Sequence, residues 1–465
     1  TMWLKHMDTG QFALNATLDV AATASTTALS LSGTTAVTSV PVGYGVTANA
    51  VKASAATQTA CATFPSTGCD TAAGANARMA SAGGTFSSTV TAALWTVDSD
   101  TDLTDNPVAP SYAGTVALSP TLVGPTGGSA GALGSTSAVL ASGTDTNASQ
   151  SWTQAGALKI SATGTYFSQT VSGQSAVLGR FSPKNFTTTV TSAGCGSFTY
   201  SGQPIAVVTV RAMDGASTQA VTPNYQGAFA RTVTLTDATA STAGAFTVVP
   251  YTIADTTFAA GIATSAPIYK FTNKNTAPVT LTLRASDGEA TSSGYTEASA
   301  PIRSGRIRLS NAYGSELLST GLPIPTVIEY YDTTPAPGWR TGTDTCTVVT
   351  PPNFAFSFPV NAKNFLAACE TALTVSGVNP SPTVRLSSPG GGNAGWTDMT
   401  LNLGATGVGN QCVTVGGAGP TATTVNTTGA TWLRFDWKGA GEVDPTARAT
   451  FGVFKSPLIY RRENY

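Results

Sequence analysis

Four carboxylates gather on one short stretch of the chain and carry its clearest chemical signal: Asp98, Asp100, Asp102 and Asp105. Alternating acidic side chains on a tight loop can direct their oxygens at one hard cation, and Ca²⁺ takes about six to eight oxygen ligands. The spacing resembles the start of an EF-hand loop, although its sixth position is not Gly and its twelfth is not Glu. The sequence therefore predicts a solvated hairpin turn here, with a calcium site formed by these four aspartates as the alternative.

Groups that catalyse bond breaking are scarce. His6 is the single histidine and lies near the start of the sequence, so a Ser-His-Asp or Cys-His arrangement would have to use it. Asp398, Asp436 and Asp444 could form a carboxylate pair, but their sequence contexts are structural in character. The glycine-rich run at 388–393 lacks the Lys and the following helix of a phosphate-binding loop. We therefore predict a protein that is not an enzyme.

Aromatic side chains near the C-terminus offer a second binding chemistry. Four tryptophans lie in this part of the chain: Trp339, Trp396, Trp432 and Trp437. Their rings could supply a stacking platform for a sugar, but aromatic rings in β-proteins more often fill the core or its rim. A carbohydrate-binding protein is therefore kept as an alternative function.

The cysteines predict an oxidising compartment. The chain has six cysteines, and with one histidine and no C-x-x-C pair a zinc site is not expected. Cys61 and Cys69 flank a short loop with Pro and Gly, and a bridge between them would stabilise the fold by about 2–3 kcal/mol. Three pairings stay open for the other four cysteines: Cys195, Cys346, Cys369 and Cys412.

Charge is unusually sparse, since charged residues make up 10% of the chain and the net charge is −1. No basic field exists to attract nucleic acid or anionic lipid. No apolar run is long enough to span a membrane. The first residues lack the basic start, apolar core and cleavage site of a signal peptide, so we expect a mature or trimmed product of something longer.

The elements that must position these residues are strands. Apolar residues alternate with polar ones along 279–286, and Asp287 and Gly288 then predict a hairpin turn. The stretch 205–212 is apolar on both faces and predicts a central strand. The residues 364–373 have a helical spacing of apolar side chains, whereas the segment rich in small residues at 124–150 predicts an exposed loop. The run 432–465 alternates as closing strands do.

A weak internal repeat sets the domain organisation. Trp95-Thr-Val-Asp98 followed by Tyr112 resembles Arg211-Ala-Met-Asp214 followed by Tyr225, and Gly179-Arg-Phe181 resembles Gly305-Arg-Ile307. We predict an all-β protein of tandem Ig-like β-sandwich domains with a distinct C-terminal β-domain. The expected domains are a β-sandwich with loop insertions at 1–178, an Ig-like β-sandwich at 179–304 and a C-terminal β-domain at 305–465 that does not follow the repeat.

Two motifs carry a family resemblance, Asn311-Ala-Tyr-Gly-Ser-Glu-Leu317 and Ala447-Arg-Ala-Thr-Phe-Gly452. With the stretches at 180–186, 195–204, 223–227, 305–318, 364–373, 386–390 and 432–465, they resemble MshQ-type proteins of the mannose-sensitive haemagglutinin (MSHA) type IV pilus system. The resemblance is good from about residue 180 onward and loose before it. It implies an extracytoplasmic, pilus-associated or surface role, no catalytic residues, and a disulfide between Cys346 and Cys369.

The leading hypothesis is a non-enzymatic structural or adhesive protein of a bacterial surface, associated with a pilus or itself a filament subunit. Its expected location is extracellular, and its expected partners are neighbouring copies of itself or pilus components. The alternative is a calcium-assisted adhesin that binds a surface glycan with its aromatic side chains and holds calcium at residues 98–105. No cofactor is expected under the leading hypothesis, and calcium belongs to the alternative.

Overall fold

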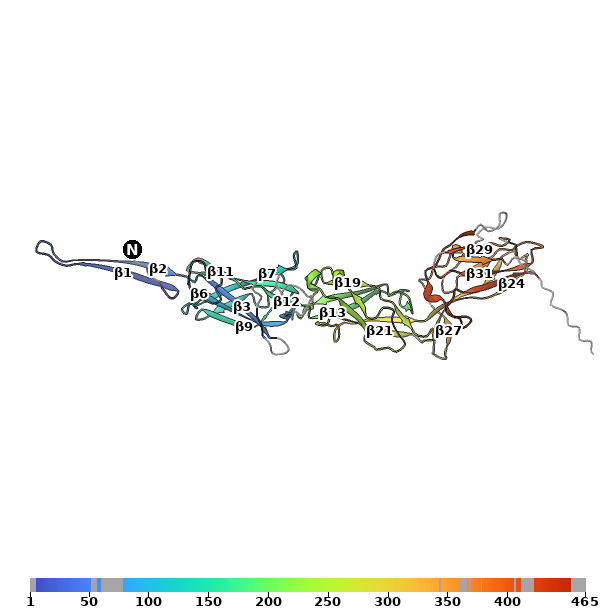
Figure 1. The fold of residues 1–465 in the computed structure, drawn as a ribbon, viewed down its shortest axis with the longest axis horizontal. Helices are drawn as coiled ribbons and strands as arrows, with labels where there is room; N and C mark the ends of the chain where they lie inside the picture. The colour runs from blue at the N-terminus through green and yellow to red at the C-terminus, as the bar shows by residue number, and fades with distance from the viewer. Residues whose placement is uncertain are drawn as a thin grey trace, which may run out of the picture.

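A computed structural model describes residues 6–51, 57–59, 78–342, 344–358, 366–367, 369–377, 379–404, 407–410 and 422–452. Three β-units follow one another along an elongated molecule, and a long hairpin extends from the end that holds the N-terminal residues (Figure 1). This confirms the prediction of an all-β chain with tandem domains. None of the helices in the described part has the length and apolar character that crossing a membrane requires.

The N-terminal hairpin stands apart from the units. It consists of β1 (Gly10–Val20) and β2 (Leu29–Ser39), which pair antiparallel along their whole length. The first predicted domain therefore contains this hairpin in addition to a sandwich.

The first unit has two sheets around one core. One sheet has the order β4-β3-β6-β9, with β3 (Gly43–Val51), β4 (Thr57–Thr59), β6 (Thr85–Ala93) and β9 (Thr144–Ser151). The other has the order β5-β12-β10-β7-β8, with β5 (Ala80–Ser81), β7 (Gly114–Gly124), β8 (Ser137–Leu140), β10 (Gly156–Tyr166) and β12 (Leu178–Ser182), while β11 (Gln169–Gln174) pairs with β10. Side chains from both sheets, such as Val46, Phe86 and Ile160, share the buried core.

The second unit has the same strand pairing. Its smaller sheet has the order β13-β15-β19, with β13 (Asn185–Ser192), β15 (Val207–Met213) and β19 (Ile262–Ser265). Its larger sheet has the order β14-β22-β21-β16-β18, with β14 (Thr199–Tyr200), β16 (Val233–Asp237), β18 (Tyr251–Ile253), β21 (Val279–Ser286) and β22 (Ala298–Arg303). A separate two-stranded antiparallel sheet pairs β17 (Gly244–Phe246) with β20 (Tyr269–Phe271). Two short 3₁₀ helices are η1 (Gly227–Phe229) and η2 (Asp255–Thr257).

The third unit also contains that pairing, which the sequence did not predict. It has a sheet β23-β26-β27 and a sheet that begins β24-β34-β31-β28, with β23 (Gly305–Leu309), β24 (Ala312–Gly314), β26 (Thr326–Asp332), β27 (Gly338–Thr341), β28 (Phe354–Ser357), β31 (Gly395–Leu401) and β34 (Thr446–Phe451). In every unit a short early strand runs parallel to the last strand, as β14 does to β22 and β24 to β34.

Further elements distinguish the third unit. Its larger sheet continues into β32 (Gly407–Asn410) and β33 (Ala422–Val425), and a third sheet has the order β25-β30-β29, with β25 (Leu322–Ile324), β29 (Leu373–Ser376) and β30 (Thr383–Leu386). Two 3₁₀ helices complete it, η3 (Pro351–Asn353) and η4 (Thr431–Leu433). The C-terminal domain is thus a variant of the common plan.

Several local predictions are confirmed and others are wrong. The strand predicted at 279–286 is β21, and the strand predicted at 205–212 is the central β15. The expected loop at 124–150 instead contains β8 and β9. β9 consists of small and polar residues, so its composition resembles that of a loop. In the described part of 364–373 the backbone is not helical, because this segment leads into β29. Of the run 432–465, β34 is a strand, whereas Trp432 lies in η4.

The strands can be set beside the two predicted domain boundaries. β22 ends at Arg303 and β23 begins at Gly305, on either side of the expected boundary after residue 304. At the earlier joint the predicted boundary after residue 178 falls inside β12, which pairs with β10 and is the last strand of the first unit. The first unit therefore extends to Ser182.

Backbone hydrogen bonds confirm the internal repeat in part. The predicted match of Gly179-Arg180 with Gly305-Arg306 is wrong, because the first pair lies in β12, the last strand of the first unit, and the second lies in β23, the first strand of the third unit. Ala92 N–H donates to Gly143 O at 2.8 Å in the first unit, and Ala212 N–H donates to Gly261 O at 2.9 Å in the second. Both glycines have positive φ, +78° and +77°, and a Cβ on either would overlap a neighbouring carbonyl oxygen. A backbone conformation that only glycine adopts easily has therefore been kept in both copies.

We expect Gly261→Ala to lower the free energy of unfolding by roughly 2–3 kcal/mol, because it combines left-handed strain with a steric overlap. Gly227→Ala is the matched control in the same unit, since Gly227 also has a positive φ of +53° but a Cβ there meets nothing within 4 Å. Urea unfolding of both variants measures the difference. Equal destabilisation by the two changes would show that the close approach at Gly261 is unimportant.

Candidate functional site

The predicted calcium ligands lie on the loop between β6 and β7, at Asp98, Asp100, Asp102 and Asp105. Their carboxylates bond within the loop: Asp100 accepts from the Thr96 hydroxyl at 2.7 Å and Asp102 from the Thr104 hydroxyl at 2.6 Å. The first of these bonds lowers the pKa of Asp100. Within the described residues no three of the aspartates bring their oxygens within 4.8 Å of one another. This geometry favours the solvated turn, and calcium binding stays a prediction.

Two of the four tryptophans come together in the third unit. Phe435 lies between Trp339 and Trp437, with ring centroids 5.1 and 4.9 Å away, and each pair meets edge to face. The Arg306 guanidinium lies over the Trp339 ring at 4.2 Å from its centroid. Edge-to-face rings do not form a flat surface, and a guanidinium already covers one face of Trp339.

The other two tryptophans lie elsewhere. Trp396 on β31 is covered by the Arg448 guanidinium at 3.6 Å from the ring centroid. Trp432 lies in η4, where its carbonyl oxygen accepts a hydrogen bond from Lys274 of the second unit. The structure therefore does not bring the four rings together as one sugar platform.

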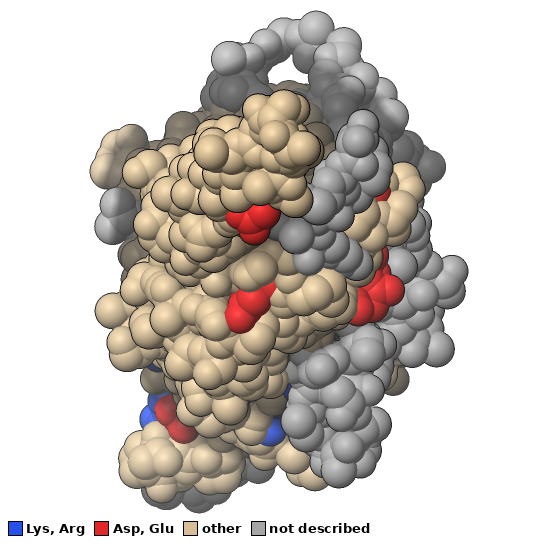
Figure 2. Space-filling model, turned by 90° about the vertical axis from the view of Figure 1, so that its left-hand side faces the viewer, with Lys and Arg blue, Asp and Glu red and all other residues tan. Residues whose placement is uncertain are grey.

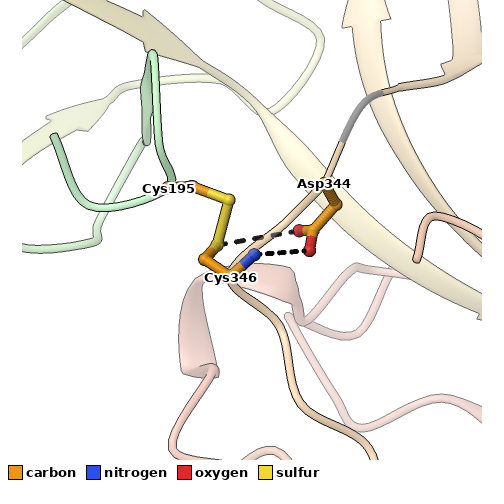
Figure 3. Close-up of side chains that lie close together, drawn as sticks. All are labelled: Cys195, Asp344 and Cys346. Atoms are coloured by element: carbon orange, nitrogen blue, oxygen red, sulfur yellow. Dashed lines mark hydrogen bonds between the residues drawn. A yellow bond between two sulfur atoms is a disulfide. The ribbon is translucent and has the colours of Figure 1, made fainter. Parts of the chain in front are cut away.

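A disulfide connects the second and third units. Cys195 follows β13, and it is bonded to Cys346, which follows β27 and lies 151 residues further along the chain (Figure 3). The predicted pairing of Cys346 with Cys369 is therefore wrong. Cys369 is disulfide-bonded as well, with a partner other than Cys346. The predicted bridge between Cys61 and Cys69 lies outside the described residues, as does Cys412.

The acidic group beside this disulfide is a structural one. Cys195, Asp344 and Cys346 are the one group of three cysteine and acidic side chains that lie within 4.8 Å of one another in the described part of the chain. Both sulfurs are bonded to each other, so neither can serve as a thiolate ligand for a metal. The trio is therefore a covalent link with a buried carboxylate beside it (Figure 3).

Asp344 ties the two units together through hydrogen bonds. It is 2% exposed and accepts from the hydroxyl of Tyr200 in β14 of the second unit at 2.8 Å. It also accepts from the backbone N–H groups of Cys346 and Thr347 and from the amide of Asn379. Burial, with the charge of Asp344, raises the pKa of Tyr200, so the phenol keeps the proton that it donates.

The hydrophobic core also crosses this joint. Phe198 and Tyr200, which belong to the second unit by sequence, are buried in the cluster that forms the core of the third unit. Arg303 lies between the units, with its guanidinium 4.5 Å from the ring centroid of Phe198 and 5.0 Å from that of Tyr330. Bending at this joint would therefore expose apolar surface and break the aromatic contacts.

Lys274 of the second unit adds a buried charge. Its ammonium donates to Gly305 O at 3.1 Å and to Trp432 O. Burial lowers the pKa of Lys274 to about 8.

A pH dependence follows from this buried lysine. The pKa of Lys274 is about 8 in the folded chain and 10.5 in the unfolded chain. Between these two pH values the folded chain binds fewer protons than the unfolded chain, so the free energy of unfolding rises with pH. Below a pH of about 8 Lys274 is charged in both states, so the burial of its charge lowers the free energy of unfolding by its full amount. We expect Lys274→Met to remove this rise, measured by denaturant unfolding at both limits. An unchanged pH dependence in that variant would contradict the assignment.

A buried ion pair connects the first and second units. Arg180 in β12 is 1% exposed, and its guanidinium donates to both carboxylate oxygens of Glu289, at 2.9 and 2.6 Å. Arg231 approaches the same carboxylate at 2.9 Å, and Arg78 donates to Glu289 O at 3.1 Å. Burial alone would raise the pKa of Glu289, but the Arg180 hydrogen bonds and the three positive charges lower it below its usual value.

Other polar contacts cross this first joint. Asn224 is fully buried, accepts from Ser129 N–H at 2.7 Å and donates to Ser129 O at 2.8 Å. Gly215 N–H donates to Ala82 O at 2.8 Å. Each joint thus combines buried polar groups from both sides, and each would leave these groups unsatisfied if the units separated.

Sequence reasoning found part of these joints. The Gly-Arg pairs at Gly179 and Gly305 marked both of them, and Arg180 is indeed the buried cation of the first. Glu289, Asp344 and Lys274 had no signal of their own, because each is a single charge on a loop whose partner lies on another unit. Their role became visible only when the units were placed in space.

Comparison with models of protein families shows the family to which the chain belongs. Successive domain models of one family match it: DUF6701 second domain at residues 40–153, third domain at 154–309 and fourth domain at 303–464. The chain belongs to the DUF6701 family. The DUF6701 boundary between the second and third domains precedes β10, whereas the strand pairing places β10 and β12 in the first unit. The MshQ resemblance itself is neither named nor contradicted by these matches.

Other comparisons add little. No curated protein matches the chain. Among solved structures the chain is similar to domains 4–9 of the surface layer protein SbsC, with 13% identity, 89% of this chain covered and a TM-score of 0.16. It spans about half of that structure, 48% of its length. A likeness at this TM-score does not define a shared fold.

Proposed function

We propose that this DUF6701 chain is a non-enzymatic structural or adhesive protein of a bacterial surface, which acts as a stiff rod. The observation that carries the proposal is that both joints are locked. The first is held by the buried pair of Arg180 with Glu289, and the second by the disulfide between Cys195 and Cys346. Units joined only by flexible linkers are expected to move relative to each other. The units of this chain are joined by buried polar contacts and a disulfide as well, so we expect little motion between them.

Compartment and composition support a surface location. Disulfides persist in oxidising environments, and the described cysteines are all bonded. The end of the molecule seen from the hairpin side is mostly uncharged, with few acidic and basic groups (Figure 2). Few charges would have to be desolvated if neighbouring subunits packed closely, so the rod is suited to a role beside a pilus or within a filament.

Electron microscopy of the purified chain tests the rod. We expect straight particles with one narrow distribution of angles at each joint. The double variant Cys195→Ala with Cys346→Ala serves as the comparison, and its second joint should show a broader distribution. Particles of the unmodified chain that bend as freely as the variant would contradict the proposed function.

Location and assembly need their own measurements. An antibody against the chain should label intact cells of the source bacterium without permeabilisation, and labelling only after lysis would refute the surface role. Regular fibres from concentrated protein would establish the filament variant. Dispersed particles would instead leave the pilus-associated rod.

The adhesin alternative has a direct test. Glycan-array binding that a chelator abolishes would establish calcium-assisted recognition of a carbohydrate. The covered faces of Trp339 and Trp396 speak against an aromatic platform, so we expect no such binding. Hydrolysis of a glycan or peptide by the clean protein would overturn the non-enzymatic assignment.

A further inference from the structure

The N-terminal hairpin has one apolar face and one polar face. Antiparallel pairing places Leu18 opposite Leu31 and Val20 opposite Leu29, so these side chains lie on the same side of the ribbon. Their neighbours on that face continue the pattern: Phe12, Leu14, Ala16, Gly33, Thr35 and Val37. The opposite face carries mainly hydroxyl, amide and carboxylate groups, including Thr17 opposite Ser32.

The half of this apolar face that lies toward the tip of the hairpin is uncovered, whereas Phe12 nearer the base is half-buried and its ring stacks on His6. Leu18, Val20, Leu29 and Leu31 are 59%, 45%, 52% and 53% exposed. In the described part of the chain β1 and β2 pair only with each other, and the hairpin extends away from the first unit (Figure 1). A two-stranded hairpin is at best marginally stable in water, and a sheet with one apolar face needs a second layer. The hairpin is therefore half of an interface.

The plan of the units identifies the missing half. In the first and second units the last strand pairs antiparallel with the strand before it in the sheet, β12 with β10 and β22 with β21. That last strand then leads within a few residues into the first strand of the next unit, as Ser182 leads to Asn185 and Arg303 to Gly305. β2 ends at Ser39 and β3 begins at Gly43, so the hairpin stands in the same relation to the first unit.

The faces agree with this equivalence. On β21 and β22 the residues that face the core alternate with outward residues, and Leu281 and Ala300 are paired and buried. Leu18 and Leu31 form the corresponding kind of pair on the hairpin, but nothing covers them. The hairpin thus has the amphipathic pattern of the last two strands of a sandwich.

Hydrogen bonds of Asp8 hold the base of the hairpin against the first unit. Asp8 accepts hydrogen bonds from Thr9 N–H at 2.7 Å and from Ser111 N–H at 3.1 Å, and Ser39 donates to Asp8 O at 2.8 Å. Thr9 is 5% exposed. This joint holds the ribbon in line with the units, as expected for a further unit of the same rod.

The area of the face argues against a second copy as the cover. Strands of 11 residues make a ribbon of about 37 Å by 10 Å, so one face offers roughly 350–400 Å². A stable complex between separate molecules usually buries about 800 Å² on each partner. A covering sheet that belongs to the same chain needs much less area, because its contact is intramolecular.

We propose that β1 and β2 are the last two strands of a further sandwich, and that their apolar face docks against the facing sheet of that sandwich, supplied by residues of the full-length protein that precede residue 1. The matched domains are the second to the fourth of the family, so the hairpin occupies the C-terminal edge of its first domain. This inference is independent of the proposed surface function.

Hydrogen exchange tests the inference. The amides of β1 and β2 are measured in the chain of residues 1–465 and in the full-length protein. We expect at least a hundredfold slower exchange in the full-length protein, at unchanged rates in β21 and β22. Equal exchange of the hairpin in the two proteins would overturn the proposal.

Paired variants of the full-length protein separate the two faces. Leu18→Asp and Leu31→Asp should restore fast exchange in the hairpin or unfold the preceding domain, whereas Thr17→Asp and Ser32→Asp on the polar face should leave it protected. Equal effects on both faces would contradict the docking. A dimer of residues 1–465 whose hairpin is protected at high concentration, and exposed by Leu18→Asp, would also overturn the proposal, because the cover would then be a second copy.

Discussion

Replacing Cys195 and Cys346 together by Ala is expected to lower the free energy of unfolding of the C-terminal unit by about 3–5 kcal/mol. The disulfide closes a loop of 151 residues, for which the chain-entropy relation gives a stabilisation of about 5 kcal/mol. The measured stabilisation by a disulfide is often smaller than this relation predicts. Both cysteines are replaced so that no free thiol remains to react with other disulfides. The burial of Phe198 and Tyr200 in the third unit would be weakened at the same time.

Fluorescence measures this loss well, because four of the seven tryptophans lie in the third unit and none lies in the second. Guanidinium unfolding of the double variant should show an earlier transition of that signal. The variant Ser192→Ala, near Cys195 but on an exposed side chain, controls for local disturbance. A double variant with an unchanged midpoint would show that hydrogen bonds and packing hold the joint without the covalent link.

Glu289→Gln is expected to cost about 3–5 kcal/mol, because it leaves the buried guanidinium of Arg180 without its negative partner. Asp398→Asn is the control at an exposed pair. Asp398 pairs with Arg448, the two side chains are 37% and 46% exposed, and loss of such a pair is expected to cost about 1 kcal/mol or less. Comparable losses in the two variants would contradict a special role for the first joint.

Acid provides a second signature of the same pair. The pKa of Glu289 is lower in the folded chain than its ordinary value of 4.5, so its stabilisation is fully present above that value and is lost as the pH falls through the folded pKa. Denaturant unfolding at a series of acidic pH values measures this loss. Glu289→Gln should be less sensitive over this range, and an identical acid response would argue that other carboxylates dominate.

The strand pattern could be predicted from the sequence, but the docking of units could not. Alternation in 279–286 identified β21 because its inward residues are apolar and its outward ones polar. β8 and β9 were missed because a strand with small side chains has the composition of a loop. The common plan of the third unit was hidden because strand pairing is conserved there without the local motifs of the repeat.

The candidate site was harder to predict for the same physical reason. The family resemblance implied a bond between Cys346 and Cys369, whereas the bond to Cys195 depends on how two units of the chain meet. The aspartates at 98–105 were conspicuous in sequence, yet each carboxylate bonds to its own loop where the structure describes it. Clustered acids were thus a weaker guide to function than isolated charges at the joints.

The position of the Cys195–Cys346 bond has a mechanical consequence. Tension applied at the two ends of the molecule reaches Cys195 just after β13 and can cross the sulfur atoms directly into residue 346. The chain between the two cysteines spans 151 residues and has a contour length of roughly 500 Å. It would then carry no tension and could not be extended. Under load, the residues between the two cysteines could therefore extend only after that one covalent bond is cut.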